Sequence, residues 1–488
     1  MKKKVVVIGS GFSSLSASCY LAKQGFDVEI IEKNTDLGGR AGRLTIDGYT
    51  FDTGPSWYWM PDVFDRFFKD FGKKTSDLYT LDRLDPAYRV FFADETITIG
   101  SGIDKICQEF ERIEKGSAVQ LKKIMTVARE NYKIAMQDIV LKPGASPLEL
   151  VTWDTVTRID RFFTSISREI RKKFKNPKLI SVLEFPVLFL GAKPTRTPSF
   201  YSFMNFADFG LGTWHPKGGI YEIVRAMKSL CEELGVRIRT SSTVDKIHVN
   251  RGSVTGIQVN GATIEADVVV CGSDYHHSET LLDEKYRQYS EAYWKKRTFA
   301  PSSLLFYVGF DRKLANVGHH NLFFDTSFEK HAEEIYDRPQ WPTEPLFYAN
   351  FPSVTDAGMA PKDGESGFFL IPIAPDLKDS QEIKERYFDL VIQRFEERTS
   401  QKIRENIVFH QSFCVSDFKE KYNSYKGNAY GMANTLAQTA FLRPKLKSKK
   451  VKNLFFTGQL TVPGPGVPPA LISGKLVSEL IGKNIYTE

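Results

Sequence analysis

The apolar positions of this chain fall mostly into short runs that are typical of buried β-strands, and helical patterns separate them. We place strands at residues 5–8, 28–31, 236–238, 244–249, 254–259, 263–264, 267–271, 304–310, 368–373 and 454–456. A hairpin is predicted over 44–51 around Asp47-Gly48, and amphipathic helices over 103–115 and from 219 onward. This alternation of strands and helices indicates an α/β fold.

The first strand opens a nucleotide-binding motif. It is followed by a Gly9-Ser10-Gly11 turn, a helical segment and a second strand that ends at Glu32. Gly9 permits the tight turn, Gly11 lets backbone N–H groups approach a pyrophosphate, and an acid about twenty residues later suits a ribose hydroxyl. The third glycine of the usual pattern is Ser14 here, which is still small enough for close helix–strand packing. These features predict a Rossmann-like βαβ unit.

A second glycine pair, Gly38-Gly39-Arg40, follows the acid. NAD-binding units do not need this pair. The segment resembles flavoproteins of the amine-oxidase type, in which the chain passes the FAD pyrophosphate at this point. The simpler alternative is an ordinary surface turn. We therefore expect FAD as the cofactor.

Composition narrows the class of protein. At 488 residues the chain is long enough for two or three domains, and its net charge of +7 is spread along its length. Its five cysteines lack the spacing of metal ligands, so we expect reduced, buried thiols in a cytosolic protein, with no disulfide and no metal site. No signal peptide or transmembrane helix is predicted, because no run of about 18 apolar residues occurs.

The order of the strands predicts that the chain leaves the nucleotide-binding domain and returns to it twice. We assign residues 1–80, 211–280 and 444–488 to three parts of one discontinuous FAD-binding domain. Residues 81–210 are expected to form a helical, membrane-associated substrate region, and 281–443 a mixed α+β substrate-binding domain.

Long segments of the chain resemble the bacterial-type carotenoid (phytoene) desaturases, a family of FAD-dependent, amine-oxidase-like flavoproteins. The segments are FDTGPS, PKGGIYEI, NFPSVTDAGMAPKDGESGFFLIPIAP, SDFKEKYNSYKGNAYGMANTLAQTAFLRPK and NLFFTGQLTVPGPGVPPALISGKLVSEL. They are distributed over essentially the whole length, and the last two are long and unusual in composition, which argues against chance similarity.

The motifs and this resemblance together imply a set of cofactor contacts. The residues expected at FAD are Gly9, Gly11, Ser13, Ser14, Glu32, Lys33, Gly38, Gly39, Arg40, Gly54, Pro55, Ser56, Val244, Gly458, Gln459, Gly466, Val467 and Pro468. Val244 is expected on the adenine side. Residues 464–468 would cross the flavin edge before a closing helix whose positive end lies under the flavin pyrimidine. Gln459 stands where a smaller residue is expected, and it either hydrogen-bonds the cofactor or is neutral.

The resemblance implies the dehydrogenation of a C40 carotenoid. A hydride leaves an allylic carbon for flavin N5, and the neighbouring carbon loses a proton. Conversion of phytoene to neurosporene or lycopene is expected. Desaturation of a later carotenoid (γ-carotene, or a 1-hydroxy-carotenoid at its 3,4 position), ketolation and isomerisation remain alternatives within the fold. Asp52, His215 and Tyr430 are candidates for a proton relay, each with a structural role as its alternative, and a quinone or oxygen is the expected electron acceptor.

The substrate would be a hydrocarbon, so its recognition requires an apolar tunnel. Trp57, Tyr58 and Trp59 are expected to line it, unless they are ordinary core aromatics. Because a carotene resides in the bilayer, we expect a peripheral protein on the cytoplasmic side of the membrane.

A basic, amphipathic pattern over residues 156–175 is the candidate for contact with the bilayer surface. One apolar stripe of a single helix is predicted from Ile159, Phe162, Phe163, Ile166 and Ile170. The alternative is a helix that packs this stripe on the protein core.

Two other classes of protein remain open at this point. An oxidase of small amines would need an aromatic cage and a lysine–water pair, and neither is recognisable. A flavin-free prenyl-lipid escort protein would leave Gly458 and the 466–468 crossing unexplained. Binding of nucleic acid has no support in the sequence.

Overall fold

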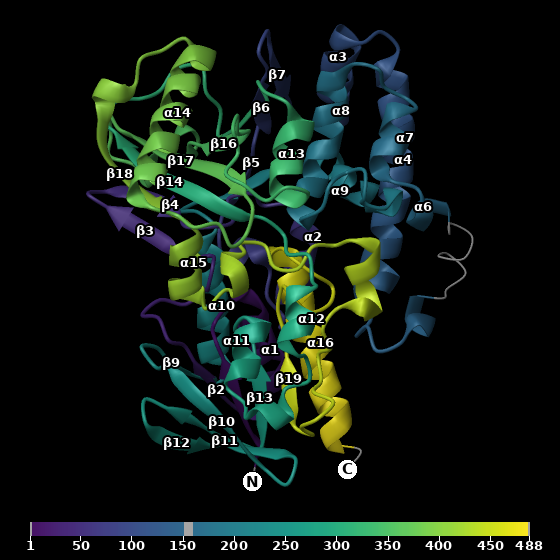
Figure 1. Ribbon diagram of the computed structural model, residues 1–488, viewed down its shortest axis with the longest axis vertical. Coiled ribbons are helices and arrows are strands. Elements are labelled where there is room, and N and C mark those ends of the chain that lie inside the picture. Colours follow the sequence, from purple (N-terminus) through teal and green to yellow (C-terminus); the bar gives the residue numbers. More distant parts are fainter. Residues whose placement is uncertain (1, 151–159, 487–488) are drawn as a thin grey trace.

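The computed structural model describes residues 2–150 and 160–486. Figure 1 shows a parallel sheet in its lower half, together with both chain ends, and a larger mixed sheet in its upper half. The chain crosses between the halves repeatedly, so each is built from segments that are distant in sequence.

The parallel sheet has five strands. Their spatial order is β19 (Leu454–Phe456), β13 (Val268–Cys271), β1 (Lys4–Ile8), β2 (Asp27–Ile31) and β9 (Arg237–Arg239). On one face, Val5 and Val7 pack with α1 (Phe12–Lys23), α10 (Tyr221–Glu233) and α16 (Val467–Tyr486). On the other face, Val6 and Ile8 pack on a three-stranded antiparallel sheet. Burial on both faces explains why these strands are continuous apolar runs.

The strands of that antiparallel sheet are β10 (Val244–Asn250), β11 (Ser253–Val259) and β12 (Ala262–Glu265). Two small ribbons complete the strand set: β3 (Arg43–Ile46) with β4 (Tyr49–Asp52), and β5 (Leu81–Arg83) with β8 (Trp214–Pro216). The first ribbon is the hairpin predicted around Asp47-Gly48.

The mixed sheet has seven strands. Their order is β18 (Ile407–Phe413), β14 (Ser302–Phe310), β17 (Glu365–Ile373), β16 (Phe347–Asn350), β15 (His320–Phe323), β6 (Tyr88–Phe91) and β7 (Thr96–Ile99). Phe306 and Phe369 on one face pack against α14 (Gln381–Thr399). Leu305 and Tyr348 point to the opposite face, because side chains alternate along a strand.

Helices cover the remaining parts of the molecule. A group at the right of Figure 1 contains α3 (Ile103–Ile113), α4 (Ser117–Ile134), α6 (Asp160–Phe163), α7 (Ile166–Arg171), α8 (Pro177–Glu184) and α9 (Phe203–Asn205). The others are α2 (Pro61–Lys69), α11 (Tyr275–Thr280), α12 (Glu291–Lys295), α13 (Phe328–Tyr336) and α15 (Val415–Tyr422). None of the helices in the described ranges combines the length and the apolar character needed to cross a bilayer.

The segment predicted to form one membrane-facing helix is divided in two. The side chain of Ser165 accepts a hydrogen bond from the backbone N–H of Arg168 and starts α7 after the end of α6. Ile166 and Ile170 are buried, with 1% and 2% of their surface exposed, whereas Phe163 is 77% exposed. The prediction of a continuous lipid-facing stripe is therefore wrong, because two of its members pack in the core. Ile159 and the side chain of Phe162 lie outside what the structure describes.

Gly474 determines how closely α16 approaches α1. A Cβ atom at this position would lie 2.4 Å from the backbone oxygen of Ser13 and 2.6 Å from Cβ of Ser16. We expect Gly474→Ala to lower the free energy of unfolding by about 1–3 kcal/mol, because the helices must move apart. A thermal melt of the full chain measures the change.

Gly482→Ala on the same helix is the matched control. Its Cβ would meet the flexible amide end of Gln24, and alanine favours the helix over glycine. We expect no loss of stability in this variant. Equal melting temperatures for the two variants would contradict the close-packing argument.

Candidate functional site

A continuous cavity connects the two halves of the molecule. Its polar part lies at the carboxyl ends of β1, β2, β13 and β19, the edge at which open α/β sheets bind ligands. Its apolar part lies under the face of the seven-stranded sheet that carries Leu305 and Tyr348. The fold therefore places a polar site and an apolar site in one continuous cavity.

Most of the predicted cofactor residues meet at this cavity. Those that line it are Gly9, Gly11, Ser13, Glu32, Lys33, Gly38, Gly39, Arg40, Gly54, Pro55, Ser56, Val244, Gly458, Gln459, Gly466, Val467 and Pro468. Ser14 does not line it. The Ser14 side chain is fully buried and faces Gly272, where a Cβ would lie 1.9 Å from the serine Oγ. Ser14 thus serves the helix–strand packing that its small size suggests, rather than cofactor contact.

The two glycine turns lie against each other. The backbone N–H of Gly38 donates to the Ser10 oxygen at 3.0 Å, and a Cβ at Gly39 would lie 3.4 Å from Cα of Gly11. Gly9 and Gly39 have φ angles of +90° and +59°, in the region that favours glycine. The turns form a narrow cradle at the N-terminus of α1, where backbone N–H groups and the helix dipole favour an anion.

Glu32 occupies the bottom of this cradle. Its carboxylate accepts hydrogen bonds from the backbone and hydroxyl of Ser10 at 2.9 and 2.7 Å, and from the backbone and side chain of Asn34 at 2.9 Å each. These bonds fix the carboxylate at the end of β2, where the motif expects a ribose.

Arg40 brings a buried cation to the polar part of the cavity. Its guanidinium donates to Ser424 Oγ at 3.0 Å and to the Asn428 oxygen at 3.2 Å, and the Gln459 amide oxygen accepts from it at 3.1 Å once that amide is turned toward it. Burial lowers the pKa of Arg40, and nearby Asp274 partly compensates.

The described residues offer no partner for Nε of Arg40. A buried donor without a partner costs about 1–3 kcal/mol. An anionic group in the cavity would satisfy it, so the cradle and the guanidinium together fit the diphosphate of FAD.

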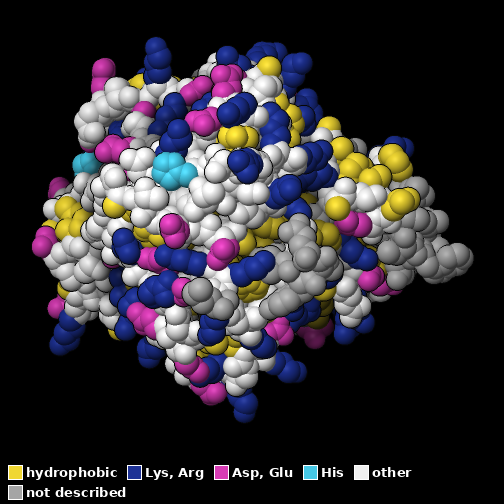
Figure 2. Space-filling view, turned by 90° about the horizontal axis from the view of Figure 1, so that it is seen from below, with side chains coloured by type: hydrophobic (Ala, Val, Ile, Leu, Met, Phe, Trp, Pro, Cys, Tyr) yellow, Lys and Arg dark blue, Asp and Glu magenta, His cyan; other side chains and the backbone are white. Residues whose placement is uncertain are grey.

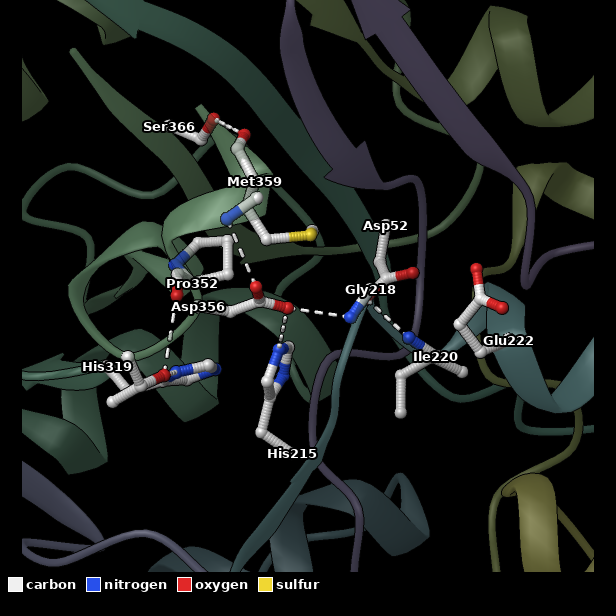
Figure 3. A network of polar contacts seen from close by, with 12 residues as sticks. Asp52, His215, Gly218, Ile220, Glu222, His319, Pro352, Asp356, Met359 and Ser366 are labelled. Atoms are coloured by element: carbon white, nitrogen blue, oxygen red, sulfur yellow. Dashed lines mark hydrogen bonds and ion pairs between the residues drawn. The ribbon is translucent and has the colours of Figure 1, made fainter. Parts of the chain in front are cut away.

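Asp52 and His215 lie outside the lining of the cavity. Asp52 accepts from the backbone N–H groups of Ile220 and Tyr221, at 2.8 and 3.2 Å, and holds the start of α10. Burial raises the pKa of Asp52 to about 6. Nε2 of His215 lies 3.3 Å from Oδ2 of Asp356, which also accepts from the backbone of Gly218. Figure 3 shows Asp356 between His215 and Gly218, with Asp52 directed at Ile220. The structure thus gives both predicted relay residues a role in holding a loop.

The predicted aromatic residues do line the cavity, together with Tyr430. Trp57 stacks on His320 with ring centroids 4.0 Å apart and planes 9° from parallel. Nε1 of Trp59 donates to the hydroxyl of Thr213, and the hydroxyl groups of Tyr58 and Tyr79 are 2.9 Å apart. The polar atoms of Tyr58 and Trp59 are thus satisfied elsewhere, which leaves apolar ring surface for a ligand.

Sequence reasoning missed Arg443, which is 2% exposed. Within the described part of the chain, its hydrogen-bond partners include no carboxylate. It donates to the backbone oxygens of Thr461, Met432 and Gln459 at 2.9, 3.0 and 2.9 Å. It also donates to the side-chain oxygen of Asn434, and burial lowers its pKa to about 10. It lies within a segment that carries the family resemblance, but nothing in the local sequence indicates these partners.

Comparisons with known proteins agree with this geometry. The family model of flavin-containing amine oxidoreductases matches residues 12–482. The chain is 41% identical to a carotenoid 3,4-desaturase of Haloarcula japonica, over 99% of this chain and 98% of the relative. It is 32% identical to a zeta-carotene-forming phytoene desaturase of Myxococcus xanthus, over 98% and 93%. A crystal structure of an oxidoreductase from Methanosarcina mazei has the same fold, with a TM-score of 0.63, 17% identity and coverage of 98% of this chain and 100% of that one.

The matches cover nearly the whole chain, and the cavity combines an anion-binding cradle with an apolar compartment. The chain therefore belongs to the flavin-containing amine oxidoreductase family and is, within it, an FAD-dependent oxidoreductase of the carotenoid desaturases.

Proposed function

We propose that this enzyme introduces a carbon–carbon double bond at the 3,4 position of a carotenoid that is already partly desaturated. The observation that carries the proposal is the 41% identity to a carotenoid 3,4-desaturase, compared with 32% to a phytoene desaturase, each over nearly the whole chain. Conversion of phytoene, which the sequence led us to expect, is the second candidate. A quinone or oxygen is the proposed electron acceptor.

The polar part of the cavity would hold FAD. Glu32 would bind the adenosine ribose and Val244 would contact the adenine side, while Arg40 and the cradle of Gly9, Gly11 and Gly39 suit the diphosphate. When bound, FAD supplies the oxidised flavin that accepts a hydride from the allylic carbon. The positive end of α16 begins at Val467 in the same wall and favours negative charge nearby.

The apolar part of the cavity would hold the polyene. Aromatic and aliphatic side chains that face it include those of Trp57, Phe185, Leu305, Phe324 and Leu346. A hydrocarbon offers no hydrogen-bonding group, so these walls would position it by shape and exclude water.

We also propose that the protein docks on the cytoplasmic face of a membrane, and exposed apolar side chains near one end of the cavity support contact with a bilayer. Segments 142–149 and 439–441 contribute to the cavity wall. Leu148 within the first segment is 75% exposed, and Leu442 directly after the second is 42% exposed. The α6 helix, which carries exposed Phe163, packs on residues 199–202. Figure 2 shows hydrophobic side chains gathered along the edge on which Figure 1 places α6.

The hydroxyl of Tyr201 lies 2.8 Å from that of Thr439, which connects residues 199–202, on which α6 packs, to the wall segment 439–441. Lys445 donates to the backbone oxygens of Gly144 and Phe441, so the two wall segments are held together. A substrate that enters from the bilayer would meet this end of the cavity.

Glu32→Gln tests the placement of the ribose. We expect it to weaken FAD binding about tenfold or more, because a hydrogen bond to a charged group contributes about 1.5–3 kcal/mol. Titration of the apoprotein with FAD measures the affinity. Glu29→Gln is the control, because Glu29 lies on β2, three residues before Glu32, and pairs with Lys4 and Arg239 away from the cavity. Unchanged FAD affinity in both variants would show that the ribose does not bind at Glu32.

The substrate is tested with the FAD-loaded enzyme in lipid vesicles that contain one carotenoid each. Phytoene, lycopene, γ-carotene and a 1-hydroxylated carotenoid are compared by the absorption spectrum of the extracted pigment. We expect a longer-wavelength chromophore from at least one of the last three and no colour from phytoene. Coloured products from phytoene alone would establish the second candidate instead, and unchanged pigment in every case would reject both.

The docking surface is tested by replacing Leu148, Phe163 and Leu442 with serine in one variant. Burial of a large apolar side chain contributes about 1.5–3 kcal/mol, so we expect vesicle binding to fall at least tenfold in a co-sedimentation assay. Serine at Val119, Val354 and Val408, which are also exposed but belong to other elements, is the control. An equal loss of vesicle binding in both triple variants would show that the membrane contact is not specific to Leu148, Phe163 and Leu442.

A further inference from the structure

A hydrogen-bonded chain of three side chains leads away from the cavity. The hydroxyls of Ser56 and Tyr348, both in the cavity wall, lie 2.9 Å apart. The Tyr348 hydroxyl also lies 2.6 Å from Nδ1 of His320, which is fully buried behind the wall. The arrangement follows from the sheet, because β15 and β16 are neighbours and place His320 opposite Asn350 and Leu322 opposite Tyr348.

The neighbours of His320 determine the direction of this chain. The side-chain amide of Asn350 donates to the His319 oxygen at 2.9 Å and approaches Nδ1 of His320 at 3.3 Å. An amide nitrogen can only donate, so Nδ1 is an acceptor and Nε2 carries the ring hydrogen. Tyr348 must then donate to Nδ1, and Ser56 must donate to Tyr348. The lone pairs of Ser56 remain available on the cavity side, so the chain is oriented to carry a proton outward.

Nε2 of His320 has no hydrogen-bond partner among the residues that the structure describes. An unsatisfied buried polar atom costs free energy and needs an explanation. Trp57 stacks on the His320 ring and holds it in place, so the chain is rigid at the end away from the cavity.

Two further imidazole rings and one carboxylate follow His320 in a row. The His319 ring lies 4.5 Å from that of His320 and 4.6 Å from that of His215. His215 in turn pairs with Asp356, and this pair lowers the pKa of Asp356 to about 2. Among the residues that the structure describes, no carboxylate forms a hydrogen bond or ion pair with His320 itself. The imidazole row therefore runs from the cavity wall toward one ionised carboxylate, and Figure 3 shows its outer end.

We propose that Ser56, Tyr348 and His320 accept the proton that is released when the carotenoid double bond forms. The inference rests on the proposed desaturase function. With FAD bound, one carbon would lose a hydride to the oxidised flavin while the neighbouring C–H bond breaks, and the electron pair of that bond would become the new π bond. The proton passes to Ser56 Oγ, the serine hydrogen to Tyr348, and the tyrosine hydrogen to Nδ1 of His320, which becomes an imidazolium.

A weak base is sufficient for this step. Loss of a hydride leaves an electron-deficient carbon, and a C–H bond next to it is strongly acidic. Burial and the neighbouring His215 lower the pKa of His320 well below its ordinary value. The ring is therefore neutral before turnover, and it releases the proton readily afterwards.

The test uses the full-length, FAD-loaded enzyme and the carotenoid that it converts. The rate of flavin reduction is followed in anaerobic single turnovers at saturating carotenoid, together with the carotenoid dissociation constant, FAD content and melting temperature. We expect Tyr348→Phe and Ser56→Ala to slow flavin reduction about 100-fold, with the dissociation constant unchanged. Ser56→Thr, which keeps a hydroxyl, should recover most of the loss.

Tyr49→Phe is the control, since Tyr49 donates its buried hydroxyl to the Phe310 oxygen and does not line the cavity. Should Tyr348→Phe lose FAD, the alanine and threonine variants of Ser56 decide the question.

Normal rates in Tyr348→Phe and Ser56→Ala would overturn the inference and leave the desaturase function standing. A raised dissociation constant with a normal rate would also overturn it, as would the same loss in Tyr430→Phe but not in Tyr348→Phe. A wild-type enzyme whose flavin no carotenoid reduces would reject the desaturase function and this inference together.

Discussion

The buried guanidinium of Arg40 is the constraint on which the cofactor half of the molecule depends. Removing a cation from water costs several kcal/mol, and its direct partners here are neutral oxygens from residues 424, 428 and 459. The chain must therefore bring its first and last segments together around one side chain. A diphosphate would supply the missing negative charge. Because such a ligand binds the folded chain, it also stabilises that fold.

The same architecture provides two different environments in one cavity. At the carboxyl ends of the parallel strands, backbone N–H groups converge and suit an anion. Under the seven-stranded sheet, alternate residues such as Leu305 and Leu322 present hydrocarbon to the cavity, while their neighbours pack on α14. Ser56 and Tyr348 are exceptions in this wall. A polar pair in an apolar compartment is costly unless its hydrogen bonds are made, and His320 supplies the last acceptor.

The parts of the structure that were predictable from sequence are those with local signals. The first βαβ unit, the hairpin and the glycine turns follow from residues within about forty positions of one another. Asp52 and His215 were predicted as relay candidates because the local sequence does not show what they bind. Their partners, Ile220 and Asp356, are more than a hundred residues away in the chain. The helical stripe failed for a different reason, because periodicity shows that a face is apolar but not whether protein or lipid covers it. Ile166 and Ile170 face the protein.

Arg443 extends the argument from the cofactor to the substrate. Its guanidinium donates hydrogen bonds to the backbone oxygens of both Met432 and Gln459. It therefore joins the segment that contains Met432 to the loop after β19, which contains Gln459. Asn434 and Gln459 both line the cavity. A carotenoid that displaced the wall segment would have to separate oxygens from a fully buried cation, which costs far more than the loss of a surface contact. Arg443 therefore resists separation of the wall segment that carries Asn434 from the loop that carries Gln459.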